Sequence, residues 1–151
     1  MTNRTLEILL GIRNFYMNDC LFCKIIAGQI PNYTVYQDDH VLAFLDIHPC
    51  AKGHTVIVPK KHFADLQQMD SRSWSECAIS IHKVIQKIQA VLKPDGMNIG
   101  MNDRPVAGQA VPHVHWHIIP RWSGDGGGSM HSIVRSKNVG EVKELAQLFV
   151  V

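Results

Sequence analysis

The 151-residue chain lacks several features that would assign it to common classes of protein. No window approaches the ~18 consecutive apolar residues that a membrane-spanning helix needs, so no membrane association is expected. The formal net charge is only +2, and the basic residues form no stripe, which argues against long nucleic acid as a partner. The sequence contains no repeats, and its only biased segment is "GDGGGS" at 124–129.

Cysteine is also scarce, with four residues at Cys20, Cys23, Cys50 and Cys77. The apolar stretch near the N-terminus is short, carries Glu7 and has no small-residue cleavage pattern, so no secretory signal is predicted. A disulfide framework is therefore not expected, and the protein is predicted to be cytoplasmic. The Cys20-x-x-Cys23 spacing indicates metal binding or redox chemistry instead.

The length is that of one domain, and its composition, 46% apolar and 19% charged, is typical of a globular protein. Residues 1–16 are predicted to be a dispensable N-terminal extension. Residues 17–151 form the predicted single domain, in which 122–151 is a C-terminal loop and tail.

Short apolar runs bounded by turn residues predict strands at 33–38, 41–46, 54–59, 97–102 and 114–119. The first two, split only by a polar turn, read as a hairpin. "FCKIIAGQIP" predicts a short helix that ends at Gly28, because Pro31 prevents its continuation. The pattern of residues 139–151 does not distinguish a closing helix from an extended tail.

A long amphipathic helix is predicted from Ser73, which with Glu76 has the spacing of a capping box. Its apolar residues recur every three or four positions, at Trp74, Ala78, Ile81, Ile85, Ile88 and Leu92. A hairpin, a third strand, a long helix and two further strands predict an antiparallel α+β domain rather than a doubly wound sheet.

Three histidines alternate with apolar residues in "HVHWHIIPR" at 113–121. Successive side chains of a strand point to opposite faces, so His113, His115 and His117 are expected on one face at intervals of ~6.6 Å. The apolar residues between them are expected to face the core. Because buried imidazoles without partners are costly, the histidine face is a solvated edge, a metal site or a site of nucleophilic catalysis.

The residues just upstream favour catalysis. Gly108 and Gln109, in "NDRPVAGQAVP", would present backbone N–H groups and an amide near the histidine face. Such donors suit an anionic oxygen better than a metal ion. A neutral imidazole can attack phosphorus and form a phosphoramidate that water later cleaves.

These motifs resemble those of the histidine-triad (HIT) family of nucleotide hydrolases and transferases. "HVHWHII" fits the family motif, in which three histidines alternate with apolar residues. The resemblance covers Asp19 to Arg121 and is nearest to the compact bacterial branch related to nucleoside phosphoramidate hydrolases. The other matching segments, in the family's order, are "CLFCKIIAGQIP", "VLAFLDIHP", "GHTVIVPKKH", "MNIGMN" and "AGQAVPHVHWHIIPR".

The resemblance implies a catalytic set of four histidines. His115 would be the nucleophile that attacks an α-phosphorus and forms a nucleotidyl-histidine. His117 would contact the phosphate or bridging atom and assist the leaving group. His54 would support the triad through hydrogen bonds, and His113 is the first residue of that triad. The family's transferase branch tends to carry glutamine at the last triad position, so His117 favours hydrolysis.

Nucleotide-binding residues follow from the same resemblance. Asp46 matches the family's ribose-binding acid. The residues that would wall the base pocket are Phe22, Ile30, Phe44 and Ile47. The residues that would hold the phosphate are Asn102, Gly108, Gln109 and His117. A serine often occupies the position of Ala110, so this chain lacks one hydroxyl donor there.

Zinc-bearing members of the family imply a metal site at Cys20, Cys23, His62 and His113. A Cys₂His₂ set closes a tetrahedron, so this zinc would be structural. Many relatives lack the cysteines, and zinc is therefore not expected to take part in the chemistry.

The resemblance further implies a five-stranded antiparallel sheet with a long helix, paired into a homodimer. The segment after Arg121 could then reach the partner's active site. The expected substrates are purine nucleoside 5′-phosphoramidates, with diadenosine polyphosphates as an alternative. A nucleotide-sensing module with incidental hydrolysis is the alternative from a different functional class.

Overall fold

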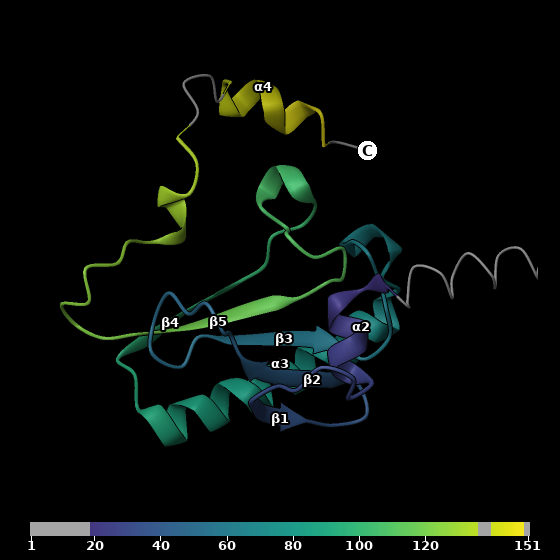
Figure 1. Cartoon of the computed structure of the whole chain (residues 1–151). Helices are drawn as coiled ribbons and strands as arrows, with labels where there is room; N and C mark the ends of the chain where they lie inside the picture. The colour runs from purple at the N-terminus through teal and green to yellow at the C-terminus, as the bar shows by residue number, and fades with distance from the viewer. Residues whose placement is uncertain (1–18, 136–139, 150–151) are drawn as a thin grey trace, which may run out of the picture.

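The computed structural model describes residues 19–135 and 140–149, so the predicted extension at 1–16 lies outside it. Figure 1 shows an antiparallel sheet beside one long helix. The elements, labelled as in Figure 1, are α2 (Leu21–Ile26), β1 (Thr34–Gln37), β2 (Val41–Leu45), β3 (Thr55–Pro59), α3 (Ser71–Leu92), β4 (Gly96–Gly100), β5 (Trp116–Arg121) and α4 (Val142–Gln147).

The five strands form one sheet in the order β1-β2-β3-β5-β4, and every neighbouring pair is antiparallel. The predicted α+β class and five-stranded sheet are therefore confirmed. The predicted end of the first helix also holds, because α2 stops at Ile26 and Gly28 adopts a left-handed backbone with φ +73°.

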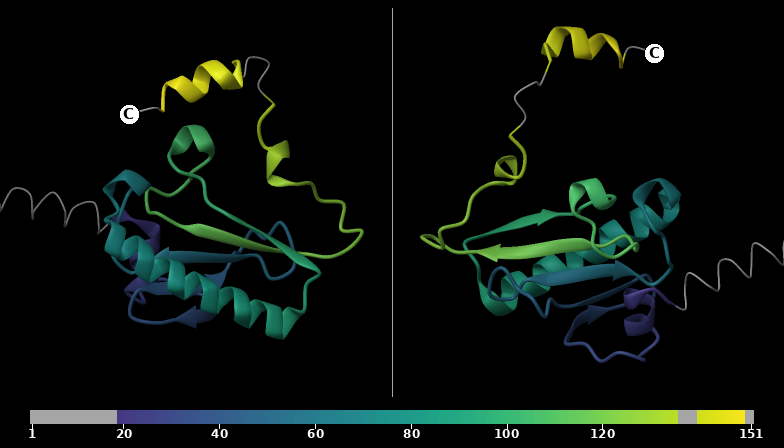
Figure 2. Two further views of the ribbon diagram at one scale, coloured as in Figure 1. Left: turned by 180° about the vertical axis from the view of Figure 1, so that it is seen from behind. Right: turned by 45° about the horizontal axis from the view of Figure 1, so that its top comes forward.

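The two faces of the sheet carry two separate apolar clusters. One lies beneath α3, which Figure 2 shows crossing the back of the sheet, and includes Ile57 and Trp116. The other lies on the opposite face, where Phe22 of α2 packs with Phe44 and Val56. The period-2 alternation of the strands distributes side chains between these clusters.

The start of α3 differs from the predicted capping box. The helix begins at Ser71, and Asp70 is its N-cap, with its carboxylate accepting from the Ser73 N–H at 2.8 Å. The prediction of Ser73 as N-cap was wrong because Asp70 and Ser73 are both good caps three residues apart. A further bond from Lys61 Nζ, at 3.0 Å, holds the Asp70 carboxylate in place.

The apolar stripe of α3 is rotated from the predicted one. Its buried residues are Cys77, Ser80, Val84 and Ile88. Ala78 is exposed and Trp74 is 43% exposed, whereas Ile81, Ile85 and Leu92 pack at the edge of the core. The hydroxyl of Ser80 donates to Asp38 Oδ2 at 2.7 Å, which lets a polar residue occupy the centre of the stripe.

We expect Asp70→Ala to lower the thermal midpoint of unfolding by about 2–4 °C, because a carboxylate cap of α3 is lost. Circular dichroism melting would measure the change. Ser75→Ala is the matched control, since it changes an exposed serine inside the helix, where alanine has the higher helix propensity. Equal midpoints for Asp70→Ala and the unchanged protein would contradict the assigned cap.

Beyond β5 the chain leaves the sheet (Figure 1). The sequence pattern of residues 139–151 did not distinguish a helix from an extended tail. Residues 142–147 form the helix α4, and none of them is buried. Within residues 19–135 and 140–149, no helix combines the length and the apolar character that crossing a membrane requires.

Candidate active site and metal site

The triad lies where the chain enters β5. The strand begins at Trp116, so His113 and His115 precede it and were wrongly predicted to lie in or at the start of a strand. The pairing of β5 with β3 ends at Trp116 and Ile57, and the Val114 N–H donates instead to Phe63 O, beyond the end of β3, at 2.7 Å. The alternation still holds, because Val114 and Trp116 pack in the cluster beneath α3.

One row of cross-strand neighbours fixes the place of the last triad histidine. Phe44, Val56, His117 and Gly100 stand opposite one another on β2, β3, β5 and β4. Paired residues of neighbouring strands share a face, so these four positions lie on the face opposite α3. His117 therefore lies on β5, the second strand from one edge of the sheet, between the apolar cluster of α2 and the edge strand β4.

His115 is held in one tautomer by a backbone carbonyl. Its Nδ1 lies 2.7 Å from the His113 oxygen, and a carbonyl only accepts, so Nδ1 carries the proton and Nε2 keeps its lone pair. The ring is 5% exposed and packs edge-on against Phe22 at a centroid distance of 5.1 Å. The geometry gives a buried imidazole with one defined nucleophilic nitrogen.

His117 and His54 form a chain of hydrogen bonds that orients the last triad histidine. The Cys50 N–H donates to His54 Nδ1 at 3.4 Å, so the proton of a neutral His54 lies on Nε2. His54 Nε2 is 2.9 Å from His117 Nδ1 and donates to it. The remaining proton of His117 is consequently on its Nε2.

Burial keeps all three of these histidines neutral near pH 7. It lowers the pKa of His115, and it lowers the pKa of His54 although the Asp46 carboxylate opposes the change. Burial, followed by the neighbouring His115 and His54, lowers the pKa of His117 to about 4. The site therefore presents uncharged imidazoles, as nucleophilic attack requires.

Asp46 lies beside this chain of histidines. Its N–H donates to the His54 oxygen at 2.9 Å, and its Oδ1 accepts from the His48 N–H at 2.8 Å. Asp46, His54 and His117 each offer a ligand atom within 4.8 Å of the other two. The predicted ribose-binding acid is thus positioned at the histidines.

Three of the four residues predicted to wall a base pocket come together. Phe22 and Phe44 pack edge-on at 5.9 Å, and Ile30 packs against the same cluster. Ile47 is 74% exposed and lies at the surface. A base-binding role stays a prediction for all four.

Asn102 and Gly108, predicted to hold the phosphate, are neighbours. Gly108 has φ +95°, and a Cβ placed on it would lie 3.5 Å from Asn102 Nδ2. The left-handed backbone favours glycine, and the missing side chain leaves its surroundings open to a ligand. Phosphate binding by both residues stays a prediction.

The side-chain amide of Gln109 contacts backbone groups of its own loop and its neighbours, and does not have the position of a side chain that faces a ligand. Its Nε2 donates to Ala64 O at 2.8 Å and to Val111 O at 3.0 Å, and its Oε1 accepts from the Arg104 N–H at 2.6 Å. The amide therefore holds the loop that leads into the triad. Any direct bond between this amide and phosphate would compete with these contacts.

The four predicted metal ligands converge. The Sγ of Cys20 lies 3.4 Å from His113 Nδ1, and the Sγ of Cys23 lies 3.3 Å from His62 Nδ1. The two Nδ1 atoms are 3.2 Å apart. Zinc bonds of ~2.3 Å to sulfur and ~2.0 Å to nitrogen place tetrahedral ligands about 3.3–3.8 Å apart, so the residues fit zinc.

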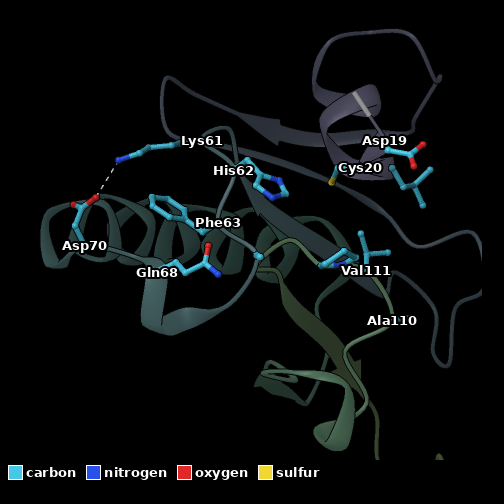
Figure 3. Close-up of a pocket in the computed structure, with 12 residues that line it drawn as sticks. Asp19, Cys20, Lys61, His62, Phe63, Gln68, Asp70, Ala110 and Val111 are labelled. Atoms are coloured by element: carbon cyan, nitrogen blue, oxygen red, sulfur yellow. Dashed lines mark hydrogen bonds and ion pairs between the residues drawn. The ribbon is translucent and has the colours of Figure 1, made fainter. Parts of the chain in front are cut away.

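The surroundings of the cluster also fit a bound cation. His113 Nε2 donates to Pro59 O at 2.9 Å, which directs the lone pair of Nδ1 at the cluster. Burial, followed by the nearby Cys20, raises the pKa of the Cys23 thiol to about 12. Two adjacent thiolates therefore need a positive charge between them. His62 and Cys20 also line a cavity of about 820 Å³. Figure 3 shows the two side chains among the other lining residues.

Comparison with known proteins decides the family. A family model described as the HIT domain matches residues 27–124. The chain belongs to the HIT family. Members of this family are generally nucleotide hydrolases or transferases.

Relatives and solved structures agree with this membership. A HIT-like protein of Methanocaldococcus jannaschii is 50% identical over 107 residues, which cover 71% of this chain and 82% of the relative. A HIT-family structure from Bacillus subtilis has a TM-score of 0.75 at 38% identity and covers 86% of this chain and 92% of that one. A zinc-bound histidine triad protein from Mycobacterium smegmatis has a TM-score of 0.69 at 35% identity, covering 73% and 80%.

This HIT protein has a second cavity, of about 480 Å³, further along β5. The cavity includes Cys50, whose backbone orients His54, a contact that sequence reasoning missed. Pro59 was likewise missed as the partner of His113. Backbone contacts of this kind leave no signal in residue type, although Cys50 lies only four residues before His54.

Proposed function

We propose that this HIT protein is a hydrolase that attacks the α-phosphorus of a nucleotide with His115 and acts best on purine nucleoside 5′-phosphoramidates. The hydrogen bond from His115 Nδ1 to the His113 carbonyl carries the proposal, because it leaves the lone pair on Nε2. The bond from His54 to His117 supports it by presenting a second, protonated nitrogen.

Two displacements complete the proposed reaction. In the first, a bond forms between His115 Nε2 and phosphorus while the bond from phosphorus to the leaving nitrogen breaks. The leaving amine takes its proton from His117 Nε2. In the second, water attacks phosphorus, the bond to His115 breaks, and the proton lost by water returns to His117.

The nucleoside is proposed to lie beside Phe22 and Phe44, with its ribose hydroxyls on Asp46. The edge-on contact of Phe22 with His115 supports this placement, because it sets an apolar wall against the nucleophile. Asn102 and Gly108 are proposed to contact the phosphate. Gln109 would act through the loop it holds, as a positioning residue.

We further propose that Cys20, Cys23, His62 and His113 bind one zinc ion. Four protein ligands complete a tetrahedron and leave no position for water, so the ion would stabilise the fold. His113 would then join the two sites, because its side chain binds the metal and its carbonyl orients His115.

A homodimer and a cytoplasmic location are proposed from the family resemblance. The dimer has one supporting feature, since β4 stands at the edge of the sheet, where a second chain could pair. Sedimentation velocity at micromolar concentration would test it. A single species with the mass of one chain would contradict the dimer.

The proposed function is tested by incubating the protein with adenosine 5′-phosphoramidate labelled at phosphorus. We expect turnover, together with a base-stable, acid-labile adduct that maps to His115 after an alkaline quench. No turnover by the folded, zinc-loaded protein would contradict the proposal. Turnover of diadenosine polyphosphates alone would favour the other substrate class, and a burst with negligible turnover would favour a nucleotide sensor.

Acid should inactivate the enzyme through His54 and His117. Both have pKa values below the usual ~6.5, so kcat/KM should be constant down to about pH 6.5 and decline between there and about pH 4. Protonated His54 no longer accepts from the Cys50 N–H, and the order of the chain is lost. The other titratable groups that face it are Asp46, whose Oδ2 lies 3.7 Å from His54 Nδ1, the Cys50 thiol, whose Sγ lies 3.6 Å from the same atom, and His115. Initial rates corrected for uncatalysed acid hydrolysis would measure the profile. A decline centred above pH 7 would contradict the assigned burial.

A further inference from the structure

The second cavity adjoins the catalytic histidines. We call it the β5 cavity, and its main walls come from Cys50, Ile119, Arg121, Trp122, Met130 and Ile133. Ile119 follows His117 by two residues on the same face of β5, a step of ~6.6 Å. Cys50 lines the cavity while its N–H contacts His54, so the cavity begins where the chain of histidines ends.

The chemistry requires space in this direction. In an in-line displacement the leaving group departs on the side of phosphorus opposite the nucleophile. His115 lies against Phe22 of α2, and His117 is the next residue along the same face. A group that leaves away from His115 and receives its proton from His117 therefore moves along β5 toward Ile119.

The roof of the cavity is a segment that folds back over the sheet. A Cβ on Gly100 would lie 2.8 Å from Met130 Cε, so Met130 covers the edge strand directly beside His117. The absence of a side chain at Gly100 makes this contact possible. Trp122 and Ile133 extend the apolar wall, and Ile133 remains 69% exposed at the opening.

The lining disfavours a polyphosphate. Arg121 donates from Nε and Nη2 to the two carboxylate oxygens of Asp125, each at 2.6 Å. Its Nη1 donates to Asn98 Oδ1 and to Gly128 O. The guanidinium is therefore engaged and neutralised, and Lys52 is the other cation that the described lining offers. Several phosphates in a row would need more positive charge than this.

We propose that the β5 cavity binds the leaving group and that the preferred substrates are nucleoside phosphoramidates of amines with an extended apolar body. This inference rests on the proposed attack by His115. Ammonia is too small to cover the apolar walls, which would stay in contact with water. An alkyl or aromatic amine covers these walls, and removing apolar surface from water is favourable. The cavity thus selects for the leaving group and not for the nucleoside.

The test compares adenosine 5′-phosphoramidates of methylamine and hexylamine, whose amines have nearly equal basicity but different apolar length. We expect kcat/KM to be roughly 10- to 100-fold higher for the hexyl compound. Ile133→Glu, which places a charge at the opening, should remove most of that ratio, and Ile133→Leu should retain it. Val134→Glu is the matched control, because Val134 is equally exposed but does not line the cavity.

Each outcome separates this inference from the proposed function. A hexyl preference lost in Ile133→Glu and kept in Val134→Glu supports the inference. Equal kcat/KM for the two compounds, with turnover that depends on His115, overturns the inference and leaves the proposed function intact. Faster turnover of diadenosine tetraphosphate than of both phosphoramidates also overturns it. Absence of turnover with all three compounds overturns the proposed function itself.

Discussion

Replacing His115 with alanine should lower kcat for adenosine 5′-phosphoramidate by about 10⁴-fold or more, since the nitrogen proposed to form the covalent intermediate is removed. His117→Ala should cost less, about 10²- to 10³-fold, because proton transfer to the leaving amine is slowed but the nucleophile remains. Steady-state kinetics with the purified, zinc-loaded variants would measure both effects.

His115 is buried, so its removal also leaves a cavity, and a second variant separates chemistry from packing. In His115→Asn the side-chain amide can still donate to the His113 carbonyl, but it has no nucleophilic nitrogen. His82→Ala changes an exposed histidine of α3 and should retain full activity. A His115→Asn protein that kept more than a tenth of the wild-type kcat would exclude His115 as the nucleophile.

The faces of the strands were predictable, but the tautomers of the histidines were not. Strict alternation in 113–117 placed the histidines on one face, because strand periodicity depends only on the order of residues. The proton positions on His115 and His117 follow from the carbonyl of His113 and the N–H of Cys50. Every residue except proline has both of these backbone groups, so residue identity carries almost no information about where they point.

The metal ligands and the β5 cavity show the same contrast over longer distances. The Cys20-x-x-Cys23 spacing indicates metal binding or redox chemistry from the sequence alone. By contrast, the cavity forms because Met130 folds back onto Gly100, thirty residues earlier, and no local pattern records that contact. The Gln109 amide is a third case, since its residue type suggested a ligand contact while the loop around it uses all of its polar atoms.

Cys20→Ala should remove bound zinc and lower the free energy of unfolding by more than about 4 kcal/mol, the range typical of a lost structural metal. Cys20 is 5% exposed and faces His113 at 3.4 Å, so its loss opens the tetrahedron at a buried position. Well below the melting temperature, kcat should change far less than stability, because no zinc ligand contacts the reacting atoms. Denaturant unfolding and metal analysis would measure both quantities.

The matched control is Cys77→Ala, which truncates an equally buried cysteine in the core beneath α3. It should retain one zinc per chain and cost only about 1 kcal/mol, the value for a small core truncation. Zinc should be supplied at one equivalent, because excess metal could bind Asp46, His54 and His117. If Cys20→Ala kept full zinc and full stability, the four-residue site would be wrong. A large loss of kcat in folded Cys20→Ala would instead show that the metal orients His115 through His113. The ring of His113 contacts the metal ligand Cys20, and its carbonyl accepts from His115.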